Sequence, residues 1–133
     1  MNVLIIEDNE HNLYLAQFLL EAKGHQVVGA RDGKSGMALA QQRGFDVILL
    51  DIQLPDMNGH EVARILTTLP DWSGAPIIAV TSFALSGDRE KALTAGCTAY
   101  LEKPIDPEQF VAQIIQILKA QPQKGEYPQW LIS

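Results

Sequence analysis

The sequence predicts an α/β fold in which a parallel β-sheet is covered by helices on both faces. Short runs rich in Val, Ile and Leu alternate five times with segments whose apolar residues recur at helical spacing. Most of these runs are apolar at nearly every position, which is typical of parallel strands buried on both faces. Right-handed crossovers then place helices on either side of the sheet. Because such strands all point the same way, the residues that follow them meet at one edge, where open α/β sheets bind ligands.

The composition fits one compact domain with a substantial core, at 133 residues and 47% hydrophobic. The net charge of -6 argues against binding to nucleic acid or an anionic membrane surface, since both require a cationic surface. No apolar run approaches the ~20 residues that cross a bilayer. The single cysteine, Cys97, has no internal disulfide partner, and the first residues show no signal-peptide pattern. We therefore expect a cytoplasmic protein that acts on a protein or cationic partner.

The first half of the predicted domain contains two helices between strands. The first helix, over about 9–23, keeps its apolar residues on one face and stops at Gly24, a residue type favoured at helix C-termini. The second starts at Asp32, whose carboxylate can cap the helix, and ends near Arg43. The expected strands of the whole chain lie at 3–6, 25–30, 45–50, 77–80 and 98–101.

Three further helices are expected in the second half. Asn58 and Glu61 have the spacing of a capping box, which predicts the start of the third helix. Ser86 can cap a short, polar fourth helix that ends at Gly96. The fifth helix should begin at Asp106, because Pro follows at the first helical position and Gln three residues on.

Charged and hydroxyl residues stand where four of the apolar runs end. Glu7 and Asp8 follow the first run, Asp51 the third and Thr81 the fourth, while Lys103 comes soon after the fifth. Three carboxylates at one edge repel one another, so a positive group must join them. Lys103 is one candidate and a divalent metal is the other. Carboxylate oxygens without a Cys/His ligand set favour Mg²⁺, or Mn²⁺, over zinc.

Such a site suits phosphoryl transfer to an aspartate. Mg²⁺ commonly binds one or two carboxylates together with phosphate oxygens, and an aspartate can be the nucleophile that accepts the phosphoryl group. Asp51 is then the natural acceptor. Asp8 would hold the metal, Glu7 would do so directly or through water, and the backbone carbonyl of Gln53 would complete the metal's ligands.

The remaining candidates supply charge neutralisation and positioning, which phosphoryl transfer chiefly requires. Lys103 would pair with one phosphoryl oxygen, and the Thr81 hydroxyl would donate a hydrogen bond to another. No evident general base is left over. The pattern therefore favours an aspartate that a partner phosphorylates and that loses the phosphoryl group slowly by itself, rather than a turnover enzyme.

Two other functions on the same architecture remain as alternatives. A phosphatase with an aspartyl nucleophile usually needs a second acid two residues further on, where this chain has Gln53. A flavin-binding module would need phosphate-cradling Gly, Ser and Thr after the first strand, whereas Glu7-Asp8-Asn9 repels phosphate unless a metal intervenes.

Four motifs stand in order along the chain: Glu7-Asp8-Asn9, Asp51 to Gly59 (DIQLPDMNG), Thr81-Ser82 and Lys103-Pro104. Taken together, they resemble the receiver domain of two-component response regulators. The resemblance covers residues 2–120. It implies that Asp51 accepts phosphate from a histidine kinase or a histidine phosphotransfer protein, with Mg²⁺ on Glu7 and Asp8 and the phosphoryl group on Thr81 and Lys103.

The resemblance also implies the detailed fold and the switch. The fold would be a flavodoxin-like (βα)5 sandwich whose five-stranded parallel sheet has the order 2-1-3-4-5. The peptide bond between Lys103 and Pro104 would be cis. Phosphorylation would draw Thr81 inward and let Tyr100 turn from solvent toward the core. This change would alter the face of the fourth helix, fifth strand and fifth helix, where a downstream protein would bind.

The residues of the first two motifs resemble those of stand-alone regulators of the bacterial cell-division type. It is also similar to receivers within hybrid histidine kinases or larger regulators, and a relic that binds partners without phosphorylation is a further alternative. Residues 121–133 are expected to be a C-terminal tail or linker stub. Alternatively, Trp130 in this segment docks on the domain or on a partner.

Overall fold

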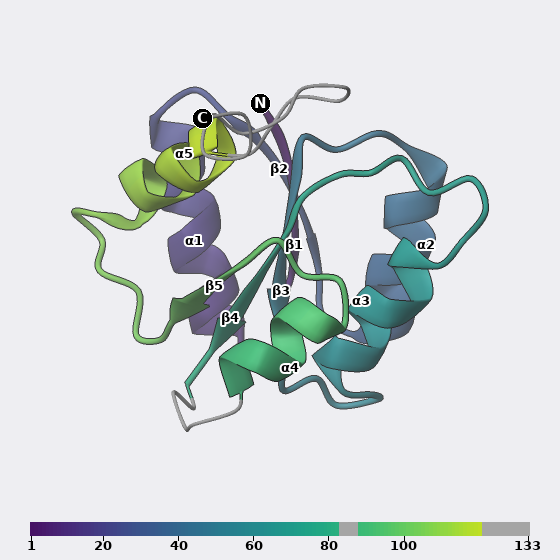
Figure 1. Cartoon of the computed structure of the whole chain (residues 1–133). Helices are drawn as coiled ribbons and strands as arrows, with labels where there is room; N and C mark the ends of the chain where they lie inside the picture. Colours follow the sequence, from purple (N-terminus) through teal and green to yellow (C-terminus); the bar gives the residue numbers. More distant parts are fainter. Residues whose placement is uncertain (83–87, 121–133) are drawn as a thin grey trace, which may run out of the picture.

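The computed structural model describes residues 1–82 and 88–120 and shows a parallel sheet between two layers of helices (Figure 1). The predicted cap Ser86 and the predicted tail with Trp130 lie outside the described residues. None of the described helices is both long enough and apolar enough to cross a membrane. The strands are β1 (Asn2–Ile6), β2 (Gln26–Ala30), β3 (Val47–Asp51), β4 (Ile77–Thr81) and β5 (Ala99–Glu102). The helices are α1 (Glu10–Ala22), α2 (Gly33–Gln42), α3 (Gly59–Thr67), α4 (Asp88–Thr94) and α5 (Phe110–Ala120).

The strand order is β2-β1-β3-β4-β5, and every neighbouring pair is parallel. This confirms the predicted flavodoxin-like sandwich. Ile6 at the end of β1 pairs with Leu50, and Asp51 at the end of β3 pairs with Val80. The neighbouring strands therefore end almost level, and the residues that follow them lie side by side.

The core has two halves, one on each face of the sheet. Leu4 and Ile6 of β1 pack in a cluster with α2, α3 and α4, whereas Val3 and Ile5 pack with α1 and α5 (Figure 1). All four side chains are at most 3% exposed. Because burial of one Leu or Ile side chain contributes about 1.5–3 kcal/mol, these residues stabilise the strand that carries the end residues.

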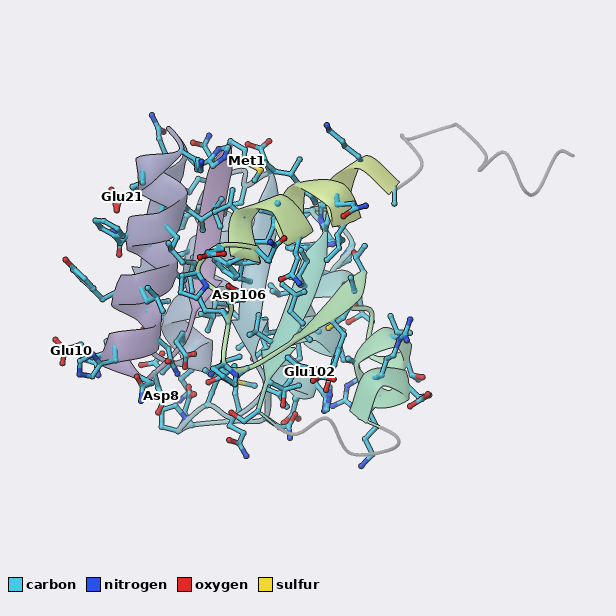
Figure 2. The ribbon with its side chains drawn as sticks, turned by 90° about the vertical axis from the view of Figure 1, so that its left-hand side faces the viewer. Met1, Asp8, Glu10, Glu21, Glu102 and Asp106 are labelled. Atoms are coloured by element: carbon cyan, nitrogen blue, oxygen red, sulfur yellow. The ribbon has the colours of Figure 1, made fainter. Side chains whose placement is uncertain are left out.

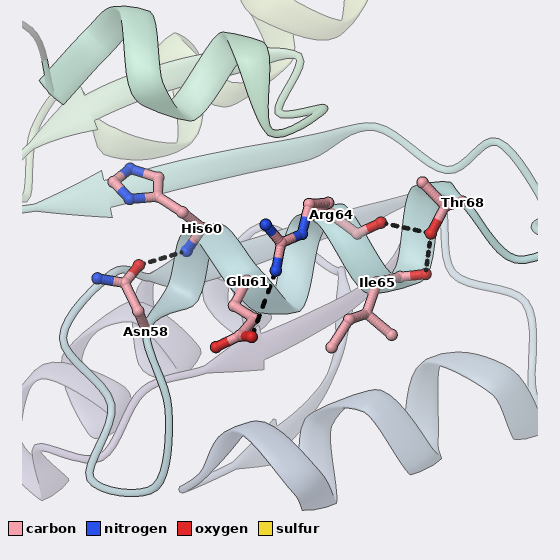
Figure 3. A network of polar contacts seen from close by, with 6 residues as sticks. All are labelled: Asn58, His60, Glu61, Arg64, Ile65 and Thr68. Atoms are coloured by element: carbon pink, nitrogen blue, oxygen red, sulfur yellow. Dashed lines mark hydrogen bonds and ion pairs between the residues drawn. The ribbon is translucent and has the colours of Figure 1, made fainter.

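The start of α3 differs in detail from a capping box. The Asn58 side chain accepts a hydrogen bond from the His60 amide at 2.8 Å, as an N-cap should (Figure 3). Glu61, however, pairs with the Arg64 guanidinium one turn later, at 3.3 Å, rather than reaching back to the cap. The Thr68 hydroxyl hydrogen-bonds the carbonyls of Arg64 and Ile65 at the other end of the helix.

The bounds of the last two helices also differ from the expected ones. The fifth helix begins at Phe110 rather than directly after Asp106, because residues 107–109 form a turn. The Asp106 carboxylate caps this turn by accepting the Glu108 amide at 3.0 Å, and its carbonyl accepts the Phe110 amide. The fourth helix ends at Thr94, and Gly96 has a positive φ of 108° that a helix does not allow.

Gly59 brings the start of α3 against the end of β3, and we predict that Gly59→Ala destabilises the fold. An added Cβ would lie 2.5 Å from the Asp51 carbonyl oxygen and 2.6 Å from the Ile52 Cα, both backbone atoms. We expect the free energy of unfolding to fall by about 2–3 kcal/mol, measured by urea denaturation. Gly44→Ala is the matched control, because nothing lies within 4 Å of a Cβ at that position. An equal effect of the two substitutions would contradict this packing.

Candidate functional site

The residues singled out from the sequence meet at one edge of the sheet. Asp51 and Thr81 are the last residues of β3 and β4. Figure 2 shows Asp8 and Glu102 at this edge, and Met1 at the opposite one. The parallel arrangement of the strands produces this convergence, because each of them runs toward the same edge.

Three carboxylates form a compact acidic cluster there. One oxygen each of Glu7, Asp8 and Asp51 lies within 4.8 Å of the others. Glu7 and Asp51 are only 5% exposed, and Asp8 is half-buried. An ion placed among them would therefore meet three hard oxygen ligands, two of them shielded from bulk water.

Lys103 neutralises part of this cluster. Its Nζ lies 2.5 Å from Glu7 Oε1 and 3.3 Å from Asp51 Oδ2, and its side chain is 13% exposed. Among the described residues, no ion pair joins Lys103 to Asp8. One cation thus serves two of the three carboxylates and leaves an excess of negative charge at the edge.

The environment of Glu7 shows the electrostatic cost of this arrangement. Burial is the main cause that raises the pKa of its carboxyl above the usual range, and the hydrogen bond and charge of Asp51 act in the same direction. Lys103 lowers this pKa but does not fully compensate. The ionised form of Glu7 is therefore under-stabilised unless further positive charge enters the site.

The loop after β3 is held in a fixed shape beside Asp51. The Gln53 amide donates to Asp51 Oδ1 at 3.1 Å, and Gln53 forms an isolated antiparallel bridge with Asn58. The Gly59 amide donates to the Ile52 carbonyl at 2.8 Å. The backbone amide of Gln53 therefore lies beside the Asp51 carboxylate, one of the three members of the acidic cluster.

The last strand attaches Lys103 to the site through backbone bonds. The Lys103 amide donates to the Thr81 carbonyl at 2.8 Å, and the Lys103–Pro104 peptide is cis, as the resemblance implied. Thr81 is 2% exposed at the end of β4. Tyr100 is half-buried on β5, where it pairs with Ala79. The roles of Thr81 and Tyr100 in switching stay predictions.

Two residues near the site were not found by sequence reasoning. The Arg31 guanidinium donates to the Asp8 carbonyl at 3.0 Å, and the Asp56 carboxylate accepts amide hydrogens from the start of α2. Both contacts join segments 22 or 23 residues apart. No local pattern indicates them, because each depends on two loops that the sheet order brings together.

The raised pKa of Glu7 predicts the pH dependence of stability without metal. A carboxyl whose pKa is higher in the folded than in the unfolded chain contributes most below the unfolded value of about 4.5. This contribution is lost as the pH rises through the folded value. The difference in unfolding free energy between wild type and Glu7→Gln should therefore fall from pH 4.5 to pH 8.

Urea denaturation in EDTA measures this difference. Glu21→Gln, at an exposed position on α1, is the control and should give a nearly flat difference. A wild-type advantage over Glu7→Gln that grows with pH would contradict the account.

Comparison with known proteins identifies the family of this chain. The sequence profile of the response regulator receiver domain matches residues 3–115. The polar-differentiation response regulator DivK of Brucella anthropi is 42% identical over 113 residues, which are 85% of this chain and 92% of that protein. DivK of Brucella ovis has the same identity and coverage.

Solved structures agree with this result. A CheY-like receiver domain protein from Methanospirillum hungatei has a TM-score of 0.83 and 31% identity, with 93% of this chain and 98% of that chain covered. The receiver domain of a sensor histidine kinase from Pseudomonas aeruginosa, with a magnesium ion coordinated in its active site cleft, has a TM-score of 0.77 and 34% identity, over 89% and 93%. The chain therefore belongs to the response regulator receiver domains of two-component systems.

Proposed function

We propose that this receiver domain is a phosphorylatable switch in which Asp51 accepts a phosphoryl group from a histidine kinase or a histidine phosphotransfer protein. The observation that carries the proposal is the meeting of Asp51, Glu7, Asp8 and Lys103 at one edge of the sheet. The receiver unit proposed here spans residues 2–120, with 121–133 as a separate tail. A receiver within a hybrid kinase or a larger regulator is not favoured, because the likeness to DivK is closer than that to the kinase receiver.

The acidic cluster is the proposed site of Mg²⁺, with Mn²⁺ as a substitute. Glu7, Asp8 and Asp51 offer the hard oxygen ligands that these cations prefer, and the Gln53 carbonyl is the proposed fourth protein ligand. The under-compensated charge at Glu7 supports this assignment, since a cation would relieve it. When bound, the metal would offset charge on the phosphoryl oxygens and allow the anionic donor to approach three carboxylates.

The protein's own contribution to transfer is orientation and charge. A carboxylate oxygen of Asp51 forms the new O–P bond while the P–N bond of the donor phosphohistidine breaks, and its electron pair returns to the imidazole nitrogen. The bond from the Gln53 amide to Oδ1 fixes the plane of the Asp51 carboxylate. Lys103 then exchanges a carboxylate partner for a phosphoryl oxygen, and the Thr81 hydroxyl donates to another.

The proposed output is a packing change on the α4, β5 and α5 face. Thr81 ends β4, and Tyr100 lies on the adjacent β5, so a movement of Thr81 toward the phosphoryl group changes the space available to the Tyr100 ring. A downstream protein that binds this face would distinguish the two states. Tyr100→Ala should leave phosphorylation intact and weaken that binding.

The domain is proposed to phosphorylate itself from a small donor and to lose the phosphate slowly by hydrolysis. A phosphatase with many turnovers is not supported, because Gln53, an exposed amide, stands where a second acid would be needed. We place the domain in the cytoplasm. Its lone thiol, Cys97, is buried, and burial raises its pKa to about 11, so that it stays protonated as a small apolar side chain.

Acetyl phosphate with Mg²⁺ tests the proposal. Intact-mass spectrometry should show one added phosphoryl group, which hydroxylamine or mild base removes, as expected of an acyl phosphate. EDTA should prevent the addition. A purified histidine kinase charged with ATP should transfer the same single group. Equal labelling with and without Mg²⁺, or a product stable to base, would contradict the proposal.

A further inference from the structure

The loop that follows Asp51 is fastened to the first turn of α2. Asp56, in this loop, accepts the Gly33 amide on Oδ1 at 2.8 Å and the Lys34 amide on Oδ2 at 3.0 Å. One carboxylate thus binds two successive amides of a helix that begins 23 residues earlier. We refer to these two hydrogen bonds as the Asp56 clamp.

The clamp completes the capping of α2. The first amides of a helix have no partner within the helix. The carboxylate of Asp32, the N-cap residue, accepts the Ser35 amide at 2.7 Å, and Asp56 takes the two preceding amides, those of Gly33 and Lys34. The Gly33 amide is the main cause that lowers the pKa of Asp56, as expected for a carboxylate at a helix N-terminus.

Close packing keeps the loop and the helix together at the same point. A Cβ at Gly33 would lie 2.6 Å from Cγ and 2.7 Å from Sδ of Met57, the residue after Asp56. The side chain of Met57 therefore occupies the space that any larger residue at position 33 would need. The loop is held both by two hydrogen bonds and by a contact that depends on glycine.

The other end of the loop reaches the candidate site directly. Its backbone is closed by the Gln53–Asn58 bridge and by Gly59 against the Asp51 carbonyl. The loop is thus held at Asp56 and at the Gln53–Asn58 bridge, and it connects the start of α2 to the backbone beside Asp51.

The residue just before the N-cap of α2 contacts the loop after β1, which carries Asp8. Arg31 donates through Nη2 to the Asp8 carbonyl at 3.0 Å, and the amide of Glu7 donates to Ala30 at the end of β2. The corner from Arg31 to Lys34 therefore contacts both loops that carry the acidic cluster, the one after β1 and the one after β3.

We propose that Asp56 is a positioning residue for the metal site, which holds the loop after Asp51 at a fixed distance from the loop of Asp8 through the α2 N-terminus and Arg31. The inference rests on the proposed function, because it concerns the affinity of the same acidic cluster for Mg²⁺. Asp56 contributes no ligand. Its effect lies in keeping Asp51 and the Gln53 carbonyl oriented toward Asp8 before the cation arrives.

The test compares the Mg²⁺ affinity of Asp56→Asn with that of the wild type. Asparagine retains one acceptor but turns an amide group toward the other helix amide, so one bond of the clamp is lost. Mn²⁺ binding followed by electron paramagnetic resonance, with Mg²⁺ as competitor, measures affinity without reference to phosphorylation. We expect dissociation constants about tenfold higher, the low end of the effect for residues that orient metal ligands. The measurement is made in about 0.3 M salt, which screens the electrostatic effect of the removed Asp56 charge on the cation, so that the remaining change reports the loss of positioning.

Asp46→Asn is the matched control. Its carboxylate also accepts a backbone amide, that of Asn2 at 2.6 Å, but it lies before β3, at the far end from the acidic cluster. This variant should lose stability without losing affinity for Mn²⁺.

A second prediction separates positioning from chemistry: Asp56→Asn should need more Mg²⁺ for half-maximal phosphorylation by acetyl phosphate, yet reach the wild-type rate at saturation.

The outcomes distinguish the two proposals. Unchanged metal affinity in folded Asp56→Asn, with normal binding by the wild type, overturns the positioning role alone. Absence of metal binding by the wild type overturns the proposed function and the positioning role with it. Should Asp56→Asn not fold, Arg31→Lys, an exposed substitution that keeps the charge, must raise the Mn²⁺ dissociation constant, and an unchanged value overturns the proposal.

Discussion

Asp51→Asn should abolish phosphorylation of the domain by acetyl phosphate, with labelling reduced at least about 100-fold. An asparagine amide is close in shape to the carboxylate but is not a nucleophile at phosphorus. The substitution leaves Glu7 and Asp8 in place, and Lys103 retains its partner at Glu7. It also removes one of three mutually repelling charges, so the fold should not be lost. Intact-mass spectrometry after incubation with Mg²⁺ measures the result.

Asp46→Asn is the control, because it removes a carboxylate from the same chain away from the site. Its labelling should match the wild type. Retained labelling in Asp51→Asn would mean that another residue accepts the phosphoryl group.

Lys103→Met should destabilise the metal-free domain by about 3 kcal/mol at pH 8. Glu7 and Asp51 have side chains only 7% and 5% exposed, and Lys103 is the cation that both contact. Methionine keeps an apolar stem of similar length, so the lost stability reports the uncompensated charge. At pH 5 the loss should be smaller, because the raised pKa of Glu7 lets this carboxyl take up a proton. Urea denaturation in EDTA at the two pH values measures both effects.

Saturating Mg²⁺ should recover part of this loss, because the cation replaces the missing positive charge among the three carboxylates. The variant should therefore gain more stability from Mg²⁺ than the wild type does, on the scale of about 2.7 kcal/mol for a ligand at 100 times its dissociation constant. Lys119→Met, at an exposed position on α5, is the control and should change stability by less than about 0.5 kcal/mol. A loss in Lys103→Met that is independent of pH and of Mg²⁺ would count against the electrostatic account of the cluster.

The strands and the convergence of the site were predictable because they depend on local patterns. Runs such as Val47 to Leu50 are apolar at every position and lie between helical segments, so buried parallel strands follow directly. Once the strands are parallel, residues at their ends, such as Asp51 and Thr81, must share an edge. The strand order came from the resemblance of the motifs to a known family, and the structure confirms it.

The parts that were not predictable depend on contacts between distant loops. Nothing near Asp56 in the sequence indicates that its carboxylate binds the amide of Gly33, and Arg31 has no local signal for its bond to the Asp8 carbonyl. The start of α5 was misplaced for a related reason. Asp106 does cap the chain, but the segment it caps is a turn that precedes the helix. A capping residue marks where amides need a partner, which is not always where a helix begins.

The most direct measurement of the central claim is the position of the phosphoryl group. The domain is incubated with acetyl phosphate and Mg²⁺, reduced with borohydride to convert an aspartyl phosphate to homoserine, and digested for peptide mass spectrometry. The account predicts that homoserine replaces Asp51, in the peptide that spans β3, and that EDTA prevents the change. A phosphoryl group at any other residue, or one that forms equally without the metal, would contradict it.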